Sequence, residues 1–180
     1  MTKKIEYRNV LGNEEFCIYV SEDCYDEVRR SKRDDQSNIP ALASTVQKTK
    51  QWIGEIMVEL ECDNAQHAYH GMRAVLHTLR DRLTISEASD FAAQLPMLIR
   101  GMYYEGWQPE RVPIKDRTKD RFLAHIRQAF PDDPNVDVEE LTNAVLAVVN
   151  RHVSQGEMAD IEACIPKSLR DLLAAKTANS

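Results

Sequence analysis

The chain repeats part of itself, and this internal repeat limits the fold more than any other feature of the sequence. Thr84–Pro96 reads TISEASDFAAQLP, and Val153–Pro166 reads VSQGEMADIEACIP. Both contain a hydroxyl residue, a Glu three positions later, an Asp three positions after that, and an apolar residue before Pro. When the chain is aligned with itself so that Thr84 lies on Ser154, Ala74–Leu76 matches Ala144–Leu146. This alignment needs no gap from Ala68 to Tyr103. The repeat predicts two copies of one helical unit.

An earlier pair of segments follows the same alignment. Trp52 and Ile56 match Phe122 and Ile126. The spacing of four positions places each pair on one face of a helix. The repeated unit therefore begins well before the stretch that is most alike.

The sequence thus predicts an all-α fold built as a tandem duplication. Repeat one spans residues 44–111 and repeat two spans residues 114–175, each of them a helical unit of roughly 60 residues. Together they form a duplicated helical domain, residues 41–180, which we expect to fold as a helical bundle with approximate two-fold symmetry. We expect helices at 44–60, 65–82, 86–94, 96–105, 115–130, 138–152, 156–163 and 166–175.

Three capping boxes support these helix starts. They are Ser44-x-x-Gln47, Thr84-x-x-Glu87 and Ser154-x-x-Glu157. In a capping box the hydroxyl accepts from a backbone N–H of the first turn, and the Glu or Gln side chain reaches back to the cap N–H. We therefore interpret the repeated hydroxyl and Glu residues as helix caps rather than as reactive groups.

The N-terminal extension, residues 1–40, does not belong to the repeat. KIEYRNV and EFCIYVS are rich in β-branched and aromatic residues, and LGNE separates them, which predicts a short N-terminal β-hairpin. The charged stretch RRSKRDDQSNIP then predicts a linker. The alternative is that this extension is poorly ordered.

Composition and charge narrow the classes of function. The chain has 180 residues and a net charge of −6, which argues against nucleic-acid binding because phosphate recognition needs a basic patch. It has no run of eighteen apolar residues, so no membrane span is expected, and its N-terminus has no apolar core typical of a secretory signal. The scattered cysteines predict reduced thiols in a cytoplasmic protein; they are Cys17, Cys24, Cys62 and Cys164.

Two histidines are weak candidates for a metal site. His67 and His70 lie three positions apart on the predicted helix 65–82, so both could ligate one zinc or iron ion. His77 shares their side of the helix, and all three are expected to face solvent. A third ligand would have to come from elsewhere in the fold. The alternative is an ordinary polar helix face.

The stretch RGMYYEGWQPER supplies the candidate binding residues. Aromatic residues and Arg are typical of interaction hot spots, and this favours Arg100, Tyr104, Glu105 and Trp107 as a recognition surface. Tyr103 matches Leu173 in repeat two and is expected in the core. For Trp107, the alternative is that it fills the joint between the two repeats.

The sequence resembles a known bacterial family in four segments. These are STVQKTKQWIGEIM, AYHGMRAVLHTLRDRL, AAQLPMLIRGMYYEGW and RHVSQGEMADI. They are similar to the family called domain of unknown function 2267, and the likeness extends from about Leu42 to Leu173. The resemblance implies an all-helical, cytoplasmic, duplicated domain without an established activity. It also implies that relatives occur alone or joined to nucleotide-sensing or stress-related domains.

Three hypotheses for function remain. The sequence contains no nucleophile motif, phosphate-binding loop or H-E-x-x-H, so we expect neither an enzyme nor a cofactor. The favoured hypothesis is a non-enzymatic interaction or regulatory module that binds a protein partner through the joint between the repeats. A small-molecule or metal-binding helical protein is the second. The third is a helix-turn-helix DNA binder, which the acidic helices after the short turns disfavour. Association with a second copy of the chain stays open.

Overall fold

Two compact units make up the chain, one from Met1 to Ser44 and the other from Thr45 to Ser180. In the first unit, β1 (Thr2–Arg8) pairs with β2 (Glu15–Ser21) in an antiparallel sheet. The computed structural model describes residues 2–8, 15–21, 39–115, 118–133, 135–164 and 170. The predicted linker before Ile39 lies outside these residues.

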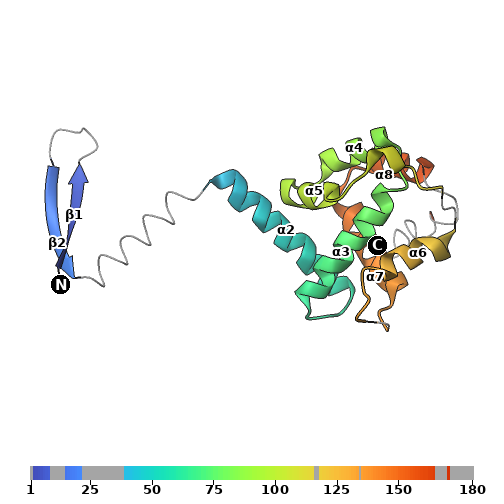
Figure 1. Ribbon diagram of the computed structural model, residues 1–180, viewed down its shortest axis with the longest axis horizontal. Coiled ribbons are helices and arrows are strands. Elements are labelled where there is room, and N and C mark those ends of the chain that lie inside the picture. The colour runs from blue at the N-terminus through green and yellow to red at the C-terminus, as the bar shows by residue number, and fades with distance from the viewer. Residues whose placement is uncertain are drawn as a thin grey trace. The chain divides into compact units, whose positions relative to one another are not determined.

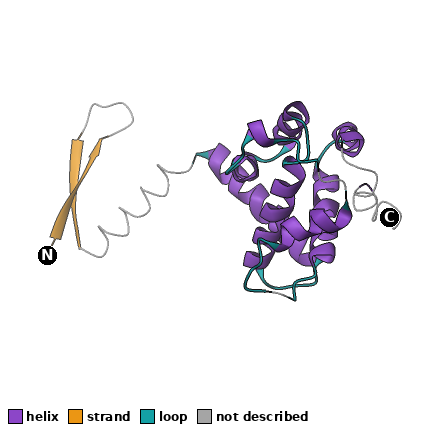
Figure 2. Cartoon of the chain, turned by 45° about the vertical axis from the view of Figure 1, so that its right-hand side comes forward, coloured by secondary structure: helices purple, strands orange, loops and turns teal. Residues whose placement is uncertain are grey.

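The described residues from Ile39 onward form helices and the turns between them, as predicted (Figures 1 and 2). Seven α-helices and one short 3₁₀ helix lie within the described residues. They are α2 (Pro40–Glu59), α3 (Ala65–Arg80), α4 (Ile85–Gln94), α5 (Met97–Tyr104), η1 (Pro109–Arg111), α6 (Lys119–Arg127), α7 (Val138–His152) and α8 (Gln155–Cys164). None of the helices in this described part has the length and apolar character needed to cross a membrane.

Hydroxyl caps begin α4 and α8, which confirms that part of the prediction. Thr84 Oγ1 accepts from the backbone N–H of Glu87, and Ser154 Oγ accepts from the N–H of Glu157, each at 3.3 Å. These bonds satisfy donors that a helix start would otherwise leave unpaired.

Two helix starts differ from the prediction. Helix α2 begins at Pro40 instead of Ser44, because proline has the φ angle and the missing N–H that suit a first helical position. The carbonyl of Ile39 accepts from the N–H of Leu42 at 2.9 Å and closes this first turn. Helix α6 begins at Lys119 instead of residue 115. The predicted helix 166–175 falls outside the described residues, apart from position 170.

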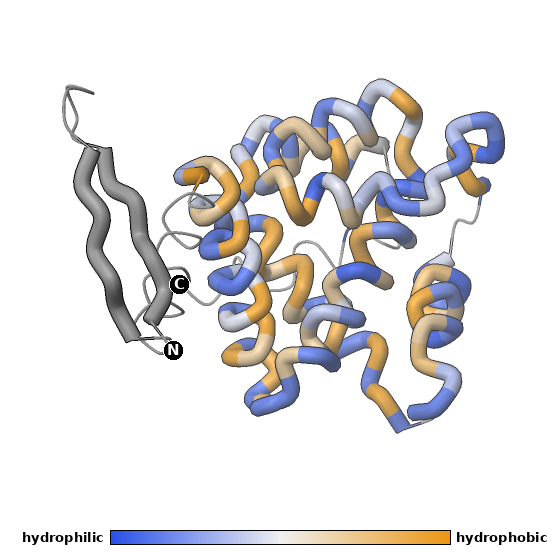
Figure 3. Tube along the Cα trace, turned by 60° about the vertical axis from the view of Figure 1, so that its left-hand side comes forward, coloured by the Kyte–Doolittle hydropathy of each residue, from blue (hydrophilic) through white to orange (hydrophobic). Residues whose placement is uncertain are grey.

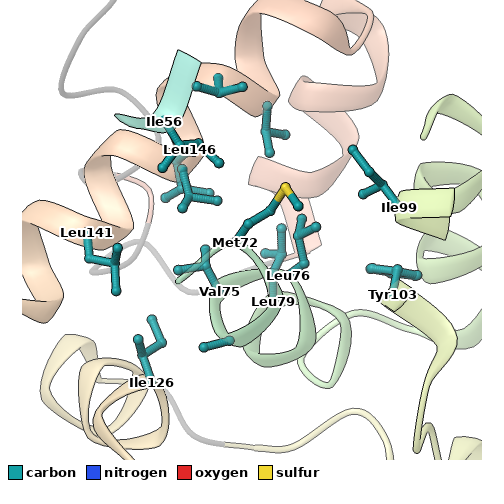
Figure 4. Packing of buried hydrophobic residues seen from close by; sticks show 14 of the residues in the cluster. Ile56, Met72, Val75, Leu76, Leu79, Ile99, Tyr103, Ile126, Leu141 and Leu146 are labelled. Carbon is teal, nitrogen blue, oxygen red and sulfur yellow. The ribbon is translucent and has the colours of Figure 1, made fainter. Parts of the chain in front are cut away.

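The hydrophobic core surrounds α3, which contacts α5, α6 and α7. Figure 4 shows Met72, Val75, Leu76 and Leu79 of α3 pointing into a cluster with residues of the neighbouring helices. All four are almost completely buried. Along the helices, hydrophobic and hydrophilic residues alternate in short stretches (Figure 3), the pattern of helices that bury one side.

Related contacts join α2 to α7 and α6 to α3. The ring of Trp52 on α2 stacks on the ring of His152 at the end of α7, with 4.9 Å between the centroids. The guanidinium of Arg82, just past α3, lies 4.9 Å from the ring centroid of Phe122 on α6. In the alignment of the sequence with itself, position 52 matches position 122, and position 82 matches position 152.

Candidate functional site

Side chains of α3 hold the C-terminal end of α5. His77 donates from Nε2 to the carbonyl of Met102 at 2.7 Å. Arg80, only 3 % exposed, donates to the carbonyls of Tyr103 and Glu105. The last carbonyls of a helix lack partners within the helix, and cations complement the negative end of its dipole. The polar face of α3 therefore fixes the position of α5.

The position of His77 corrects the expectation that it faces solvent. Its ring is half-buried between α3 and the end of α5. Burial lowers its pKa, and the nearby charges of Arg80 and Arg73 lower it further, against the opposing effects of the Met102 carbonyl and Asp81. His77 thus acts as a neutral hydrogen-bond donor here.

Tyr103 is a core residue, as predicted. Its side chain is fully buried, its hydroxyl donates to the carbonyl of Ala88 at 3.1 Å, and its ring meets Phe91 edge-on. Burial, and secondarily the neighbouring Tyr104, raises the pKa of Tyr103 far above its usual value. The tyrosine thus joins α5 to α4 and stays uncharged.

The candidate binding residues after Tyr103 already contact other residues of the chain. Tyr104 and Trp107 are half-buried and pack on each other, with 5.3 Å between ring centroids. Gly106 has a φ of +66°, and this left-handed turn places Trp107 against Tyr104. Glu105 is exposed, but its carboxylate pairs with Arg73 at 2.9 Å. This end of α5 is largely occupied by contacts within the chain.

Each of the two candidate metal ligands has a contact within the chain. The ring of His67 packs against Phe130, with 5.4 Å between centroids. The amide of Gln66 lies 2.9 Å from His70 Nε2. Within the described part of the chain, no three His, Cys, Asp or Glu residues are placed to hold a metal ion. The structure therefore supplies His67 and His70 with no third ligand there.

A shallow hollow of about 500 Å³ lies between α2 and α7. Arg151 bridges Glu55 and Glu59, and His152 donates to Glu55 at 2.9 Å. Burial opposes ionisation of Glu55, but hydrogen bonds from Gln51 and His152 and the cations His152 and Arg151 outweigh it and lower its pKa. The charges lining the hollow thus pair with one another.

Four carboxylates gather where α4 contacts α8. They come from the repeated Glu and Asp positions: Glu87, Asp90, Glu157 and Asp160. Burial raises the pKa of Glu157, and repulsion from Asp90, Asp160 and Glu87 raises it further. This cluster weakens the contact at neutral pH.

Exposed apolar residues lie on two adjacent stretches at the opposite end of α5. Val46 on α2 is 42 % exposed, and Met97 and Leu98 at the start of α5 are 47 % and 50 % exposed. Thr45 Oγ1 accepts from the backbone N–H of Leu98 at 3.1 Å, so the two stretches are adjacent. Isolated apolar side chains are common on surfaces, but a cluster drawn from two helices is typical of a contact site.

Cations accompany these apolar residues. Lys50 follows Val46 by four positions and Arg100 follows Met97 by three, so each is a neighbour on its helix surface. We call Val46, Lys50, Met97, Leu98 and Arg100 the α2–α5 face. Sequence reasoning selected only Arg100 of these five. The run Met97-Leu98-Ile99 was a usable signal, because a short helix can bury only part of such a run.

Comparison with known proteins places the chain in a family. The family described as uncharacterized conserved protein (DUF2267) matches residues 49–172. No curated protein matches the chain. The chain therefore belongs to the DUF2267 family, as the resemblance in sequence predicted.

Proposed function

We propose that this member of the DUF2267 family is a non-enzymatic interaction or regulatory module that binds a protein partner through the α2–α5 face. One observation carries the proposal: Val46, Met97 and Leu98 lie on two stretches joined by the hydrogen bond from Leu98 to Thr45, and they remain 42–50 % exposed. Burying such side chains against a partner is favourable by about 25 cal/mol per Å² of apolar surface. This binding surface is not the one that the sequence analysis favoured, which was the joint between the two repeats.

The end of α5 and the hollow between α2 and α7 are less suited to bind a partner than the α2–α5 face. Glu105 is already paired, and Tyr104 and Trp107 already pack on each other. In the hollow between α2 and α7, Arg151 pairs with Glu55 and Glu59, and His152 hydrogen-bonds to Glu55, so these carboxylates are already engaged within the chain. The α2–α5 face is where apolar surface and charge are both available.

We also propose that the helical body arose by tandem duplication. Its support is the reciprocity of contacts at matching positions of the two proposed repeats. Trp52 stacks on His152, while Phe122 packs on Arg82 at the same distance of 4.9 Å. The first helix of each proposed repeat would thus pack on the second helix of the other. Such an exchange makes the two repeats one folding unit.

The decisive experiment compares two serine variants of the full chain. Leu98→Ser removes an apolar side chain from the α2–α5 face, and Val58→Ser removes one that is 76 % exposed elsewhere on α2. Capture from a native lysate should retain one partner with wild type and Val58→Ser and lose it with Leu98→Ser. Equal capture by both variants would place the binding surface elsewhere.

A further inference from the structure

We propose, building on the proposed function, that the partner of the α2–α5 face is an acidic amphipathic helix. The charge of the face carries this inference. The two charged residues of the face, Lys50 and Arg100, are both positive, and the stretches that form it, residues 45–54 and 97–104, contain no acidic residue. The chain as a whole has a net charge of −6, so this face is a basic exception on an acidic protein.

These cations are also unpaired, unlike others nearby. In the described parts of the chain, Lys50 and Arg100 have no ion-pair partner. Arg73 and Arg151, by contrast, pair with carboxylates. Carboxylates arriving with a partner would meet cations that are not already neutralised, and this complementarity raises the association rate and fixes the register.

The arrangement of the apolar residues fits a helix. Val46 and the pair Met97 and Leu98 belong to two helices joined by the hydrogen bond from Leu98 to Thr45. An amphipathic helix presents apolar side chains at i, i+3, i+4 and i+7, so one such stripe can cover anchors on both helices. Acidic residues beside the stripe would then face Lys50 and Arg100.

The same charges disfavour the two other occupants. In a two-fold dimer the same basic face of each copy would oppose the other, so the cations of the two copies would repel one another. An anionic membrane would attract the face but repel the net charge of −6 on the chain. A short acidic helix can contact the α2–α5 face without approaching the acidic remainder of this protein's surface.

At the matching positions, the second half of the chain keeps the cation Arg100, as Arg170, but none of the other four residues of the face. Under the proposed duplication, Val46 and Lys50 correspond to Asp116 and Asp120. Met97 and Leu98 correspond to Lys167 and Ser168. The second repeat thus has polar or acidic residues where the first has apolar ones and a cation. Recognition, not folding, accounts for the difference.

The test uses a labelled synthetic peptide and the full-length protein. The peptide has Leu at i, i+3, i+4 and i+7 and Glu at flanking positions, and a control peptide has Gln in place of each Glu. Fluorescence anisotropy should give a Kd of about 10–100 μM for the acidic peptide, weaker at higher salt. Lys50→Glu and Leu98→Ser should each weaken binding about tenfold. Arg111→Glu, the charge-matched control on η1, should leave Kd within about twofold.

Each other outcome overturns the inference in a recognisable way. No binding of the acidic peptide, or equal binding of the Gln control, would reject an acidic partner. The proposed function would still stand if Leu98→Ser abolished capture of a protein from lysate. Vesicles of phosphatidylserine and phosphatidylcholine that bind wild type but not Leu98→Ser would assign the face to a membrane. Leu98-dependent dimerisation in analytical ultracentrifugation would assign it to a second copy. Circular dichroism of each variant checks that the fold is kept.

Discussion

Gly71 on α3 packs directly against Leu141 on α7, the position that matches it in the second proposed repeat. A Cβ at Gly71 would lie 3.0 Å from Leu141 Cγ and closer still to Cδ1. Leu141 is 1 % exposed, so its side chain would have to shift within the core to admit a Cβ at Gly71. The absence of a side chain at Gly71 therefore sets how closely α3 and α7 approach.

Gly71→Ala should destabilise the fold despite the better helix propensity of alanine. In a helix interior, alanine is more favourable than glycine by about 1 kcal/mol, but overpacking of a core lowers stability by about 1–3 kcal/mol. We expect a net loss of roughly 1 kcal/mol in the free energy of unfolding, measured by urea denaturation. Gly54→Ala is the control, because nothing lies within 4 Å of its Cβ position, and it should stabilise. In a double-mutant cycle, Leu141→Ala should remove the penalty at Gly71.

Arg80 should matter far more for stability than Arg73, although both contact the end of α5. Arg80→Met would leave the carbonyls of Tyr103 and Glu105 without their buried donor, at a cost of about 2–4 kcal/mol. Arg73→Met breaks an exposed ion pair and should cost under about 1 kcal/mol. Thermal and urea denaturation of the two variants would measure the difference. Similar losses of stability in the two variants would show that Arg80 is not the main residue that holds the end of α5.

Local features of this fold could be predicted from the sequence. The caps Thr84 and Ser154 act within one helical turn, so their pattern is readable without knowing the rest of the fold. The burial of Leu76 and Leu146 follows from apolar spacing, which also depends on nearby residues alone. The pattern failed at the start of α2, where Pro40 rather than Ser44 begins the helix.

Contacts between distant segments could not be predicted in this way. His77 lies opposite the apolar stripe of α3, so periodicity assigns it to solvent, and only the docking of α5 buries it. The run Met97-Leu98-Ile99 is apolar throughout, and the phase of a short helix decides which side chains are exposed. Ile99 is buried, while Met97 and Leu98 are exposed and form part of the α2–α5 face.

Trp107→Ala should give an intermediate loss of stability. The side chain is half-buried against Tyr104 and the edge of the core, so its truncation removes part of the contact that a fully buried Trp would make. We expect a loss of about 2 kcal/mol, below the roughly 3–5 kcal/mol of a fully buried aromatic residue. Partner capture should be unaffected once folding is complete. A Trp107→Ala variant that is stable but no longer binds the partner would show that the binding surface lies at the C-terminal end of α5.

Glu157→Gln should stabilise the protein at neutral pH and change how its stability depends on pH. Burial raises the pKa of Glu157 in the folded state, and so do the charges of Asp90, Asp160 and Glu87. The carboxyl group of Glu157 therefore binds its proton more tightly in the folded protein than in the unfolded chain. The resulting stabilisation is present below the ordinary pKa of Glu. It is lost as pH rises through the folded-state pKa.

The glutamine variant carries no charge in either state, so this loss with rising pH should be absent from it. At pH 7 we expect a gain of up to about 1 kcal/mol over wild type, the usual limit for partly solvated charges. At about pH 4, where the wild-type carboxyl is largely protonated, the gain should vanish. Urea denaturation at both pH values measures it, and Glu139→Gln, whose carboxylate pairs with Lys119, is the control that should not stabilise. A gain that is equal at both pH values would mean that repulsion among the four carboxylates is not its source.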